Sequence, residues 1–85
     1  MEEQGTVIMY GTTWCPDCLR SKRFLERHAV PYEWVNIEEV PAAGALVRSL
    51  NRGMQVVPTI VLPDGLILAE PSDRALAQAL GLAER

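Results

Sequence analysis

The stretch Thr13-Trp14-Cys15-Pro16-Asp17-Cys18-Leu19-Arg20 contains both cysteines of the chain, three positions apart. It follows an apolar, β-branched run at residues 6–10 that predicts a buried strand. Proline is common at the first helical position, so Pro16 predicts a helix that begins there and has Cys15 as its N-cap. Unpaired backbone N–H groups and the helix dipole favour a thiolate at an N-cap. We therefore expect Cys15 to act as a nucleophile.

Cys18 stands one helical turn after Cys15. From there its sulfur is expected to attack a mixed disulfide formed on Cys15, which closes an intramolecular disulfide and releases the reduced substrate. The cytosol keeps ordinary thiols reduced, so two cysteines in a small intracellular domain indicate a redox or metal-binding pair rather than a structural crosslink. The spacing therefore predicts Cys15 and Cys18 as catalytic residues with different roles.

The composition indicates one compact domain spanning residues 1–85, because 85 residues with 48% hydrophobic content support a single modest core. There is no apolar run of about 18 residues or more, so we expect no membrane partner. Residues 1–4 are acidic, unlike the basic start of a secretion signal, and we expect a cytoplasmic protein. The net charge of -3 argues against nucleic acid as a partner.

The first half of the chain predicts a β-α-β unit. The run at residues 6–10 is apolar throughout, which is typical of a buried strand in a parallel sheet. A helix from residue 16 to about residue 29 follows, and then a second strand at residues 32–37. The helix residues that we expect to face the sheet are Cys18, Ser21, Phe24 and Leu25.

The second half predicts a helix, a hairpin and a last helix. Apolar runs at residues 58–62 and 66–69 flank a Pro-Asp-Gly turn, so they are expected to pair as antiparallel strands. A last helix follows and closes at Gly81. The earlier helix begins at Pro41, and its expected core face contains Ala43, Leu46, Val47 and Leu50.

The resulting order, β-α-β-α-β-β-α, with Trp-Cys-Pro-x-Cys at the first helix and Val57-Pro58 before the third strand, resembles the glutaredoxin family. Within that family the chain looks like the small bacterial proteins of the mycoredoxin type. The resemblance covers nearly the whole chain and implies an α/β, thioredoxin-like fold in which a four-stranded mixed sheet is flanked by three helices. The segments that carry it are Thr12–Arg20, Val57–Thr59, Asp64–Gly65 and Pro71–Ser72.

The resemblance implies a substrate-binding surface beside the cysteines. The Val57-Pro58 peptide is expected to be cis and to face Cys15, so that the Val57 backbone pairs with an extended substrate. The alternative is a trans proline that merely begins an edge strand. Trp14 and Pro16 would add apolar contacts to the substrate, although Trp14 is also interpreted as a plain packing residue.

Because the chain departs from the family pattern, the identity of its low-molecular-weight thiol stays open. Asp17 stands where members that use glutathione commonly have Tyr, and no Lys or Arg precedes Arg20. Residues 70–73 replace a Gly-Gly-x-Asp element. Glutathione, mycothiol and bacillithiol are therefore all candidate cosubstrates. The ribonucleotide-reductase hydrogen donor is a weaker match, because its Trp-Ser-Gly-Phe segment is absent.

Asp17 is the most unusual residue at the expected site. Its carboxylate opposes the effect of the helix dipole on Cys15 by about 1 kcal/mol at a partly exposed position, and salt reduces the effect. We hypothesise that Asp17 makes the dithiol more reducing and disfavours anionic substrates. The alternative is an acidic residue that only stabilises the first helical turn.

Other polar residues near the expected site each have two interpretations. At the start of the last helix, Ser72 and Asp73 would bind a substrate carboxylate through their N–H groups or cap the helix with their side chains. His28 is expected at the end of the first helix, without a catalytic role. Three cations of the first helix would attract carboxylates of a thiol or form a solvated helix face, and these are Arg20, Lys22 and Arg23.

The expected function is a thiol-disulfide oxidoreductase that reduces protein disulfides or mixed disulfides. A low-molecular-weight thiol or a flavoprotein reductase would recycle it, and we expect a monomer with no tightly bound cofactor or metal. The alternative is an iron-sulfur or metal-binding module. Two cysteines and one distant histidine do not supply four ligands, so a cluster would need Cys15 in a dimer. The intact cysteine pair disfavours a redox-inactive interaction domain.

Overall fold

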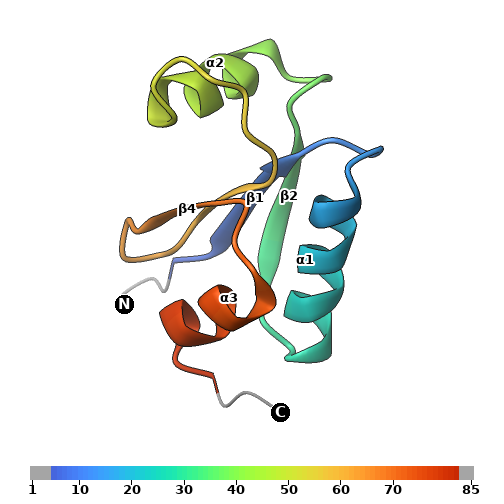
Figure 1. Cartoon of the computed structure of the whole chain (residues 1–85), viewed down its shortest axis with the longest axis vertical. Helices are drawn as coiled ribbons and strands as arrows, with labels where there is room; N and C mark the ends of the chain where they lie inside the picture. The colour runs from blue at the N-terminus through green and yellow to red at the C-terminus, as the bar shows by residue number, and fades with distance from the viewer. Residues whose placement is uncertain (1–4, 83–85) are drawn as a thin grey trace.

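The structure is a computed structural model that describes residues 5–82. Within these residues the chain forms strands and helices in the order β-α-β-α-β-β-α, which confirms the predicted order (Figure 1). None of these helices has the length and apolar character that a bilayer span requires. The bounds are β1 (Val7–Gly11), α1 (Pro16–Arg27), β2 (Tyr32–Asn36), α2 (Pro41–Leu50), β3 (Thr59–Val61), β4 (Ile67–Ala69) and α3 (Asp73–Leu80).

The strands form one mixed sheet in the order β2-β1-β3-β4. β1 runs parallel to β2, with Met9 opposite Trp34, and antiparallel to β3, with Met9 opposite Ile60. β3 and β4 pair as the predicted antiparallel hairpin. Because β1 lies inside the sheet, the loop after its last residue emerges between β2 and β3, and this loop leads to Cys15.

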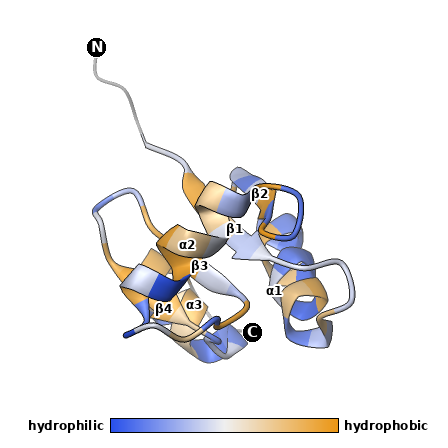
Figure 2. Ribbon diagram, turned by 90° about the horizontal axis from the view of Figure 1, so that it is seen from above, coloured by the Kyte–Doolittle hydropathy of each residue, from blue (hydrophilic) through white to orange (hydrophobic). Residues whose placement is uncertain are grey.

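Two apolar clusters hold helices on opposite faces of the sheet (Figure 1). The larger cluster joins alternate β1 residues, Val7 and Met9, to α1 and α3. The smaller cluster joins α2 to the other face of the sheet, near Tyr10 and Val35. Hydrophilic and hydrophobic residues both occur around α1 (Figure 2), as expected of a helix with one face on a sheet. The predicted sheet-facing residues Cys18, Ser21, Phe24 and Leu25 are all buried.

One prediction about burial is wrong. In α2, Leu46 is 41% exposed, and Gly44 takes a place in the buried face instead. The buried residues of this helix are Ala43, Gly44 and Val47, two of which are small, and so the contact stripe is narrow. The prediction that β1 is a buried strand beside a parallel neighbour is confirmed, since it lies inside the sheet and its residues alternate between buried and half-buried.

Candidate active site

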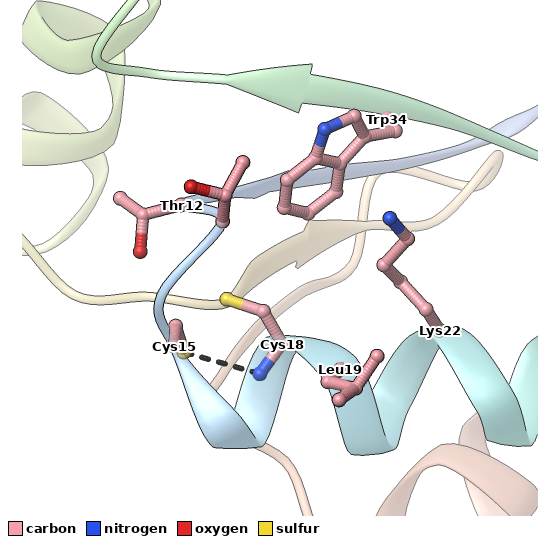
Figure 3. Close-up of a pocket in the computed structure, with 7 residues that line it drawn as sticks. Thr12, Cys15, Cys18, Leu19, Lys22 and Trp34 are labelled. Atoms are coloured by element: carbon pink, nitrogen blue, oxygen red, sulfur yellow. Dashed lines mark hydrogen bonds between the residues drawn. The ribbon is translucent and has the colours of Figure 1, made fainter.

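Cys15 is the N-cap of α1 and Pro16 is its first residue, as the sequence predicts. The Cys15 sulfur accepts a hydrogen bond from the backbone N–H of Cys18 at 3.1 Å (Figure 3). An N-cap side chain normally satisfies an N–H in the first turn with an oxygen, and here the acceptor is sulfur. The same N–H and the helix dipole favour negative charge on that sulfur.

Cys18 lies deeper than Cys15, with 1% of its surface exposed against 7% for Cys15. Its sulfur points away from α1 toward Thr12 and Trp34 (Figure 3). Burial, followed by the hydrogen bond with Cys15 and the charges of Cys15 and Asp17, raises the pKa of the Cys18 thiol from 9.0 to about 12. Both cysteines are free thiols. The two sulfurs therefore occupy different environments.

The Val57-Pro58 peptide is cis, which confirms that prediction and excludes the trans alternative. The Val57 carbonyl oxygen lies 3.8 Å from the Cys15 sulfur and accepts its S–H. Pro58 is buried just before β3. The segment before β3 thus stands directly beside the sulfur at which a substrate would react.

Trp14 lies on the surface next to Cys15, with 63% of its area exposed. Its indole N–H donates a hydrogen bond to the carboxylate of Glu38, in the loop that follows β2, at 3.0 Å. The interpretation of Trp14 as a plain packing residue is therefore wrong. The indole ring is exposed, and its N–H is fixed by the Glu38 carboxylate.

Arg20 joins α1 to the start of α3. It donates to the Asp73 carboxylate at 2.8 Å, to the Pro71 carbonyl at 3.1 Å and to the Asp17 carboxylate at 3.5 Å. The prediction that Arg20 belongs to a solvated face is wrong, because the fold brings an acidic helix start beside it. Ser72 is the N-cap of α3, and its hydroxyl accepts the N–H of Ala75 at 3.0 Å.

A pocket of about 110 Å³ opens beside the two cysteines. The Lys22 ammonium lies 4.2 Å from the centre of the Trp34 ring at its wall. The Thr12 hydroxyl is buried without a hydrogen-bond partner among the described residues. The sequence analysis did not identify Thr12 and Trp34 as site residues. Trp34 could have been suspected, because it lies on the same face as Tyr32 on the strand that was expected beside the first. The lining residues are Thr12, Thr13, Cys15, Cys18, Leu19, Lys22 and Trp34.

His28 ends α1 as its C-cap, as predicted, and its ring packs on Phe24 with 4.4 Å between the ring centres. It is therefore a helix-end residue. Among residues 5–82, no group of three or more His, Cys, Asp or Glu side chains is placed to hold a metal ion.

The fold and the site define a thioredoxin-fold protein with a Cys-x-x-Cys dithiol at the start of α1, opposite a cis-proline. The family model of glutaredoxin matches residues 7–67. This chain belongs to the glutaredoxin family.

Relatives of the chain agree with this assignment. A protein of Mycobacterium tuberculosis whose name places it among the glutaredoxins is 40% identical over 68 residues, which are 80% of this chain and 81% of that protein. Mycoredoxin 1 of Corynebacterium glutamicum is 32% identical over 67 residues, 79% of this chain and 82% of that protein. The crystal structure of a glutaredoxin from Archaeoglobus fulgidus superimposes with a TM-score of 0.75 at 28% identity, covering 87% of this chain and 84% of that one.

Proposed function

We propose that this protein is a thiol-disulfide oxidoreductase that reduces protein disulfides or mixed disulfides, with Cys15 as nucleophile and Cys18 as resolving thiol. The asymmetry of the two sulfurs carries the proposal. The Cys15 sulfur accepts the Cys18 N–H at 3.1 Å at a helix start, whereas Cys18 is buried with a pKa of about 12. A thiolate is the reactive form of a cysteine, so the first attack belongs to Cys15.

Reduction of the substrate then takes two thiol-disulfide exchanges. The Cys15 thiolate attacks a substrate disulfide, a mixed disulfide forms on Cys15, and one substrate sulfur leaves as a thiolate that takes a proton from water. Cys18 then attacks the Cys15 sulfur and breaks the mixed disulfide, and the proton of Cys18 passes to the departing substrate thiolate, so that the Cys15–Cys18 disulfide closes and the second substrate thiol is released. Two molecules of a low-molecular-weight thiol reduce that disulfide and leave as their own disulfide.

The Val57 backbone is the proposed docking edge for substrates. Its carbonyl faces the Cys15 sulfur at 3.8 Å, and an extended peptide laid alongside would bring its own cysteine to Cys15. Trp14, Pro16 and Asp17 are the residues that we propose as further substrate contacts, at and just before the start of α1. This arrangement would make recognition depend mainly on main-chain pairing.

Mycothiol is the cosubstrate that we propose among the three candidate thiols, because mycoredoxin 1, a relative over 79% of this chain, has a name that points to that thiol. The Asp73 carboxylate is already paired with Arg20 and is less available to bind glutathione, which supports a different thiol. We also propose a cytoplasmic location, where such thiols keep the pair reduced.

Turnover of mixed disulfides made from mycothiol, glutathione and bacillithiol tests the proposal. We expect the highest kcat/KM with the mycothiol mixed disulfide, no activity in Cys15→Ser, and retained small-thiol exchange in Cys18→Ser. Equal activity of Cys15→Ser and the natural protein would overturn the assignment of the nucleophile. A preference for glutathione or bacillithiol would overturn only the choice of thiol.

A further inference from the structure

Trp34 and the Cys18 sulfur converge on the same point of β1. A Cβ atom placed on Gly11 would lie 2.6 Å from the Cys18 sulfur and 2.9 Å from two carbon atoms of the six-membered ring of Trp34. Only a residue without a side chain leaves room for both. The far end of the indole ring and the sulfur are therefore neighbours above Gly11, and both line the pocket beside the active site (Figure 3).

Lys22 holds the ring of Trp34 from the α1 side. Its ammonium lies 4.2 Å from the ring centre, within the range of an attractive cation–π contact. Lys22 follows Cys18 by one helical turn, so the two side chains project from the same face of α1. Lys22, one turn after Cys18, thus holds the indole ring that adjoins the Cys18 sulfur.

This arrangement shields Cys18 from solvent. Only 1% of Cys18 is exposed, and burial is the largest contribution to its raised pKa. The titratable or charged groups around it are Cys15 and Asp17 at the start of α1 and Lys22 in the pocket. A shielded thiol reacts slowly with dissolved reagents, but a disulfide on Cys15 is presented to it intramolecularly at high effective concentration.

We propose that Trp34 is a positioning residue that covers the Cys18 sulfur, so that Cys18 reacts with a disulfide on Cys15 and not with external thiols or oxidants. This role matters for turnover only if Cys18 is the resolving thiol, so the proposal rests on the proposed function. Cys18 is thereby reserved for the resolving step. The chemistry is otherwise unchanged, since Trp34 neither gives nor takes a proton or an electron.

Alkylation of Cys18 by iodoacetamide tests this role without using turnover. Cys15→Ser leaves Cys18 as the single thiol of the chain. In that background we expect Trp34→Leu to raise the rate of alkylation at pH 8 about tenfold and to move its pH profile to lower pH, because water and reagent reach the sulfur. Trp34→Phe, whose ring is shorter, should give a smaller increase in the same direction.

Tyr32→Leu is the matched control. Tyr32 lies on the same strand and face as Trp34, two residues earlier, and its hydroxyl donates to Glu26 rather than contacting the cysteines. This variant loses an aromatic ring from β2 but should leave the alkylation of Cys18 unchanged. An equal acceleration in Tyr32→Leu would overturn the proposal, because general loosening of β2 would then explain the result.

Lys22→Met keeps the apolar stem and removes the ammonium from the ring. We expect it to accelerate alkylation less than Trp34→Leu does. If Trp34→Leu fails to fold, as judged by circular dichroism, Trp34→Phe and Lys22→Met decide the question. Unchanged alkylation of Cys18 in the folded variants would overturn the role of Trp34. The proposed function is tested separately, and turnover that does not depend on Cys15 would contradict it.

Discussion

Arg20 of α1 and Asp73 of α3 form an ion pair of 2.8 Å between two helices that lie on the same face of the sheet. The second guanidinium nitrogen also donates to the Pro71 carbonyl, just before α3 begins. One side chain therefore fixes the start of α3 against the first turns of α1. The connection lies two residues after Cys18 in the sequence and links the active-site helix to the rest of the fold.

Arg20→Gln should lower the free energy of unfolding by about 0.5–1.5 kcal/mol, because a charge-assisted pair is lost at a partly exposed position. Urea denaturation at low and high salt measures the change, which should shrink as salt screens the pair. Arg27→Gln is the matched control, since Arg27 is 4.0 Å from Asp73 and more exposed. A loss in Arg27→Gln as large as that in Arg20→Gln would contradict the prediction.

Gly11→Ala should destabilise the protein by about 1–3 kcal/mol, because the added methyl group collides with Cys18 and Trp34 in a packed region. Gly44→Ala is the contrasting variant. Its added Cβ would meet Arg48 and Ile37 at an ordinary 3.6 Å, and alanine favours the helix by about 0.5–1 kcal/mol. The midpoint temperature of thermal unfolding should therefore fall in Gly11→Ala and rise in Gly44→Ala. A shift of the same sign in both variants would refute the prediction.

Stability should fall as the pH rises from about 9 to about 12. In the unfolded chain Cys18 ionises near its ordinary pKa of 9.0, whereas the folded protein keeps the proton until about 12. The folded state then binds more protons than the unfolded state, so the free energy of unfolding decreases with a slope of up to about 1.4 kcal/mol per pH unit. Below pH 9 both states are protonated and the contribution is constant.

Cys18→Ser should make this alkaline loss shallower, as measured by urea denaturation between pH 8 and 11. Tyr32 adds a similar effect above pH 10, because burial and the hydrogen bond to Glu26 raise its pKa from 10.0 to about 12. Tyr32→Phe removes that contribution. Identical pH profiles for Cys18→Ser and the natural protein would show that Cys18 does not cause the loss.

Asp17→Asn should make the protein less reducing and should improve its activity on anionic mixed disulfides. The carboxylate is one of the charges that raise the pKa of Cys18, and its effect is about 1 kcal/mol or less beside the Arg20 guanidinium. The ratio of kcat/KM for a glutathione mixed disulfide to that for a hydroxyethyl mixed disulfide measures the preference. A ratio that does not respond to Asp17→Asn, at low salt, would refute the hypothesis.

The order of elements was predictable because local signals are strong in this chain. Proline marks the start of α1 and α2, the Pro-Asp-Gly turn marks the hairpin, and Gly81 ends α3. The extent of burial was less predictable. Leu46 fits a helical apolar period yet is exposed, because the period does not say how closely a helix of small residues approaches the sheet.

The position of Cys15 at the N-cap and the cis Val57-Pro58 peptide also followed from the sequence, the first from proline chemistry and the second from the family resemblance. The partners of Arg20 did not. An arginine on a helix looks the same in the sequence whether it meets solvent or an acid, and Asp73 lies 53 residues further along the chain.

The local chemistry of the chain sets the cysteine spacing, the proline that starts the helix and the alternation of strands and helices, because these depend on neighbours within a few residues. Folding alone brings Trp34 and Gly11 to the Cys18 sulfur, Val57 to the Cys15 sulfur and Asp73 to Arg20. Each of these contacts joins different segments of the chain, and their closeness depends on the register and packing of the whole sheet. The difference between the two sulfurs is therefore a property of the tertiary structure.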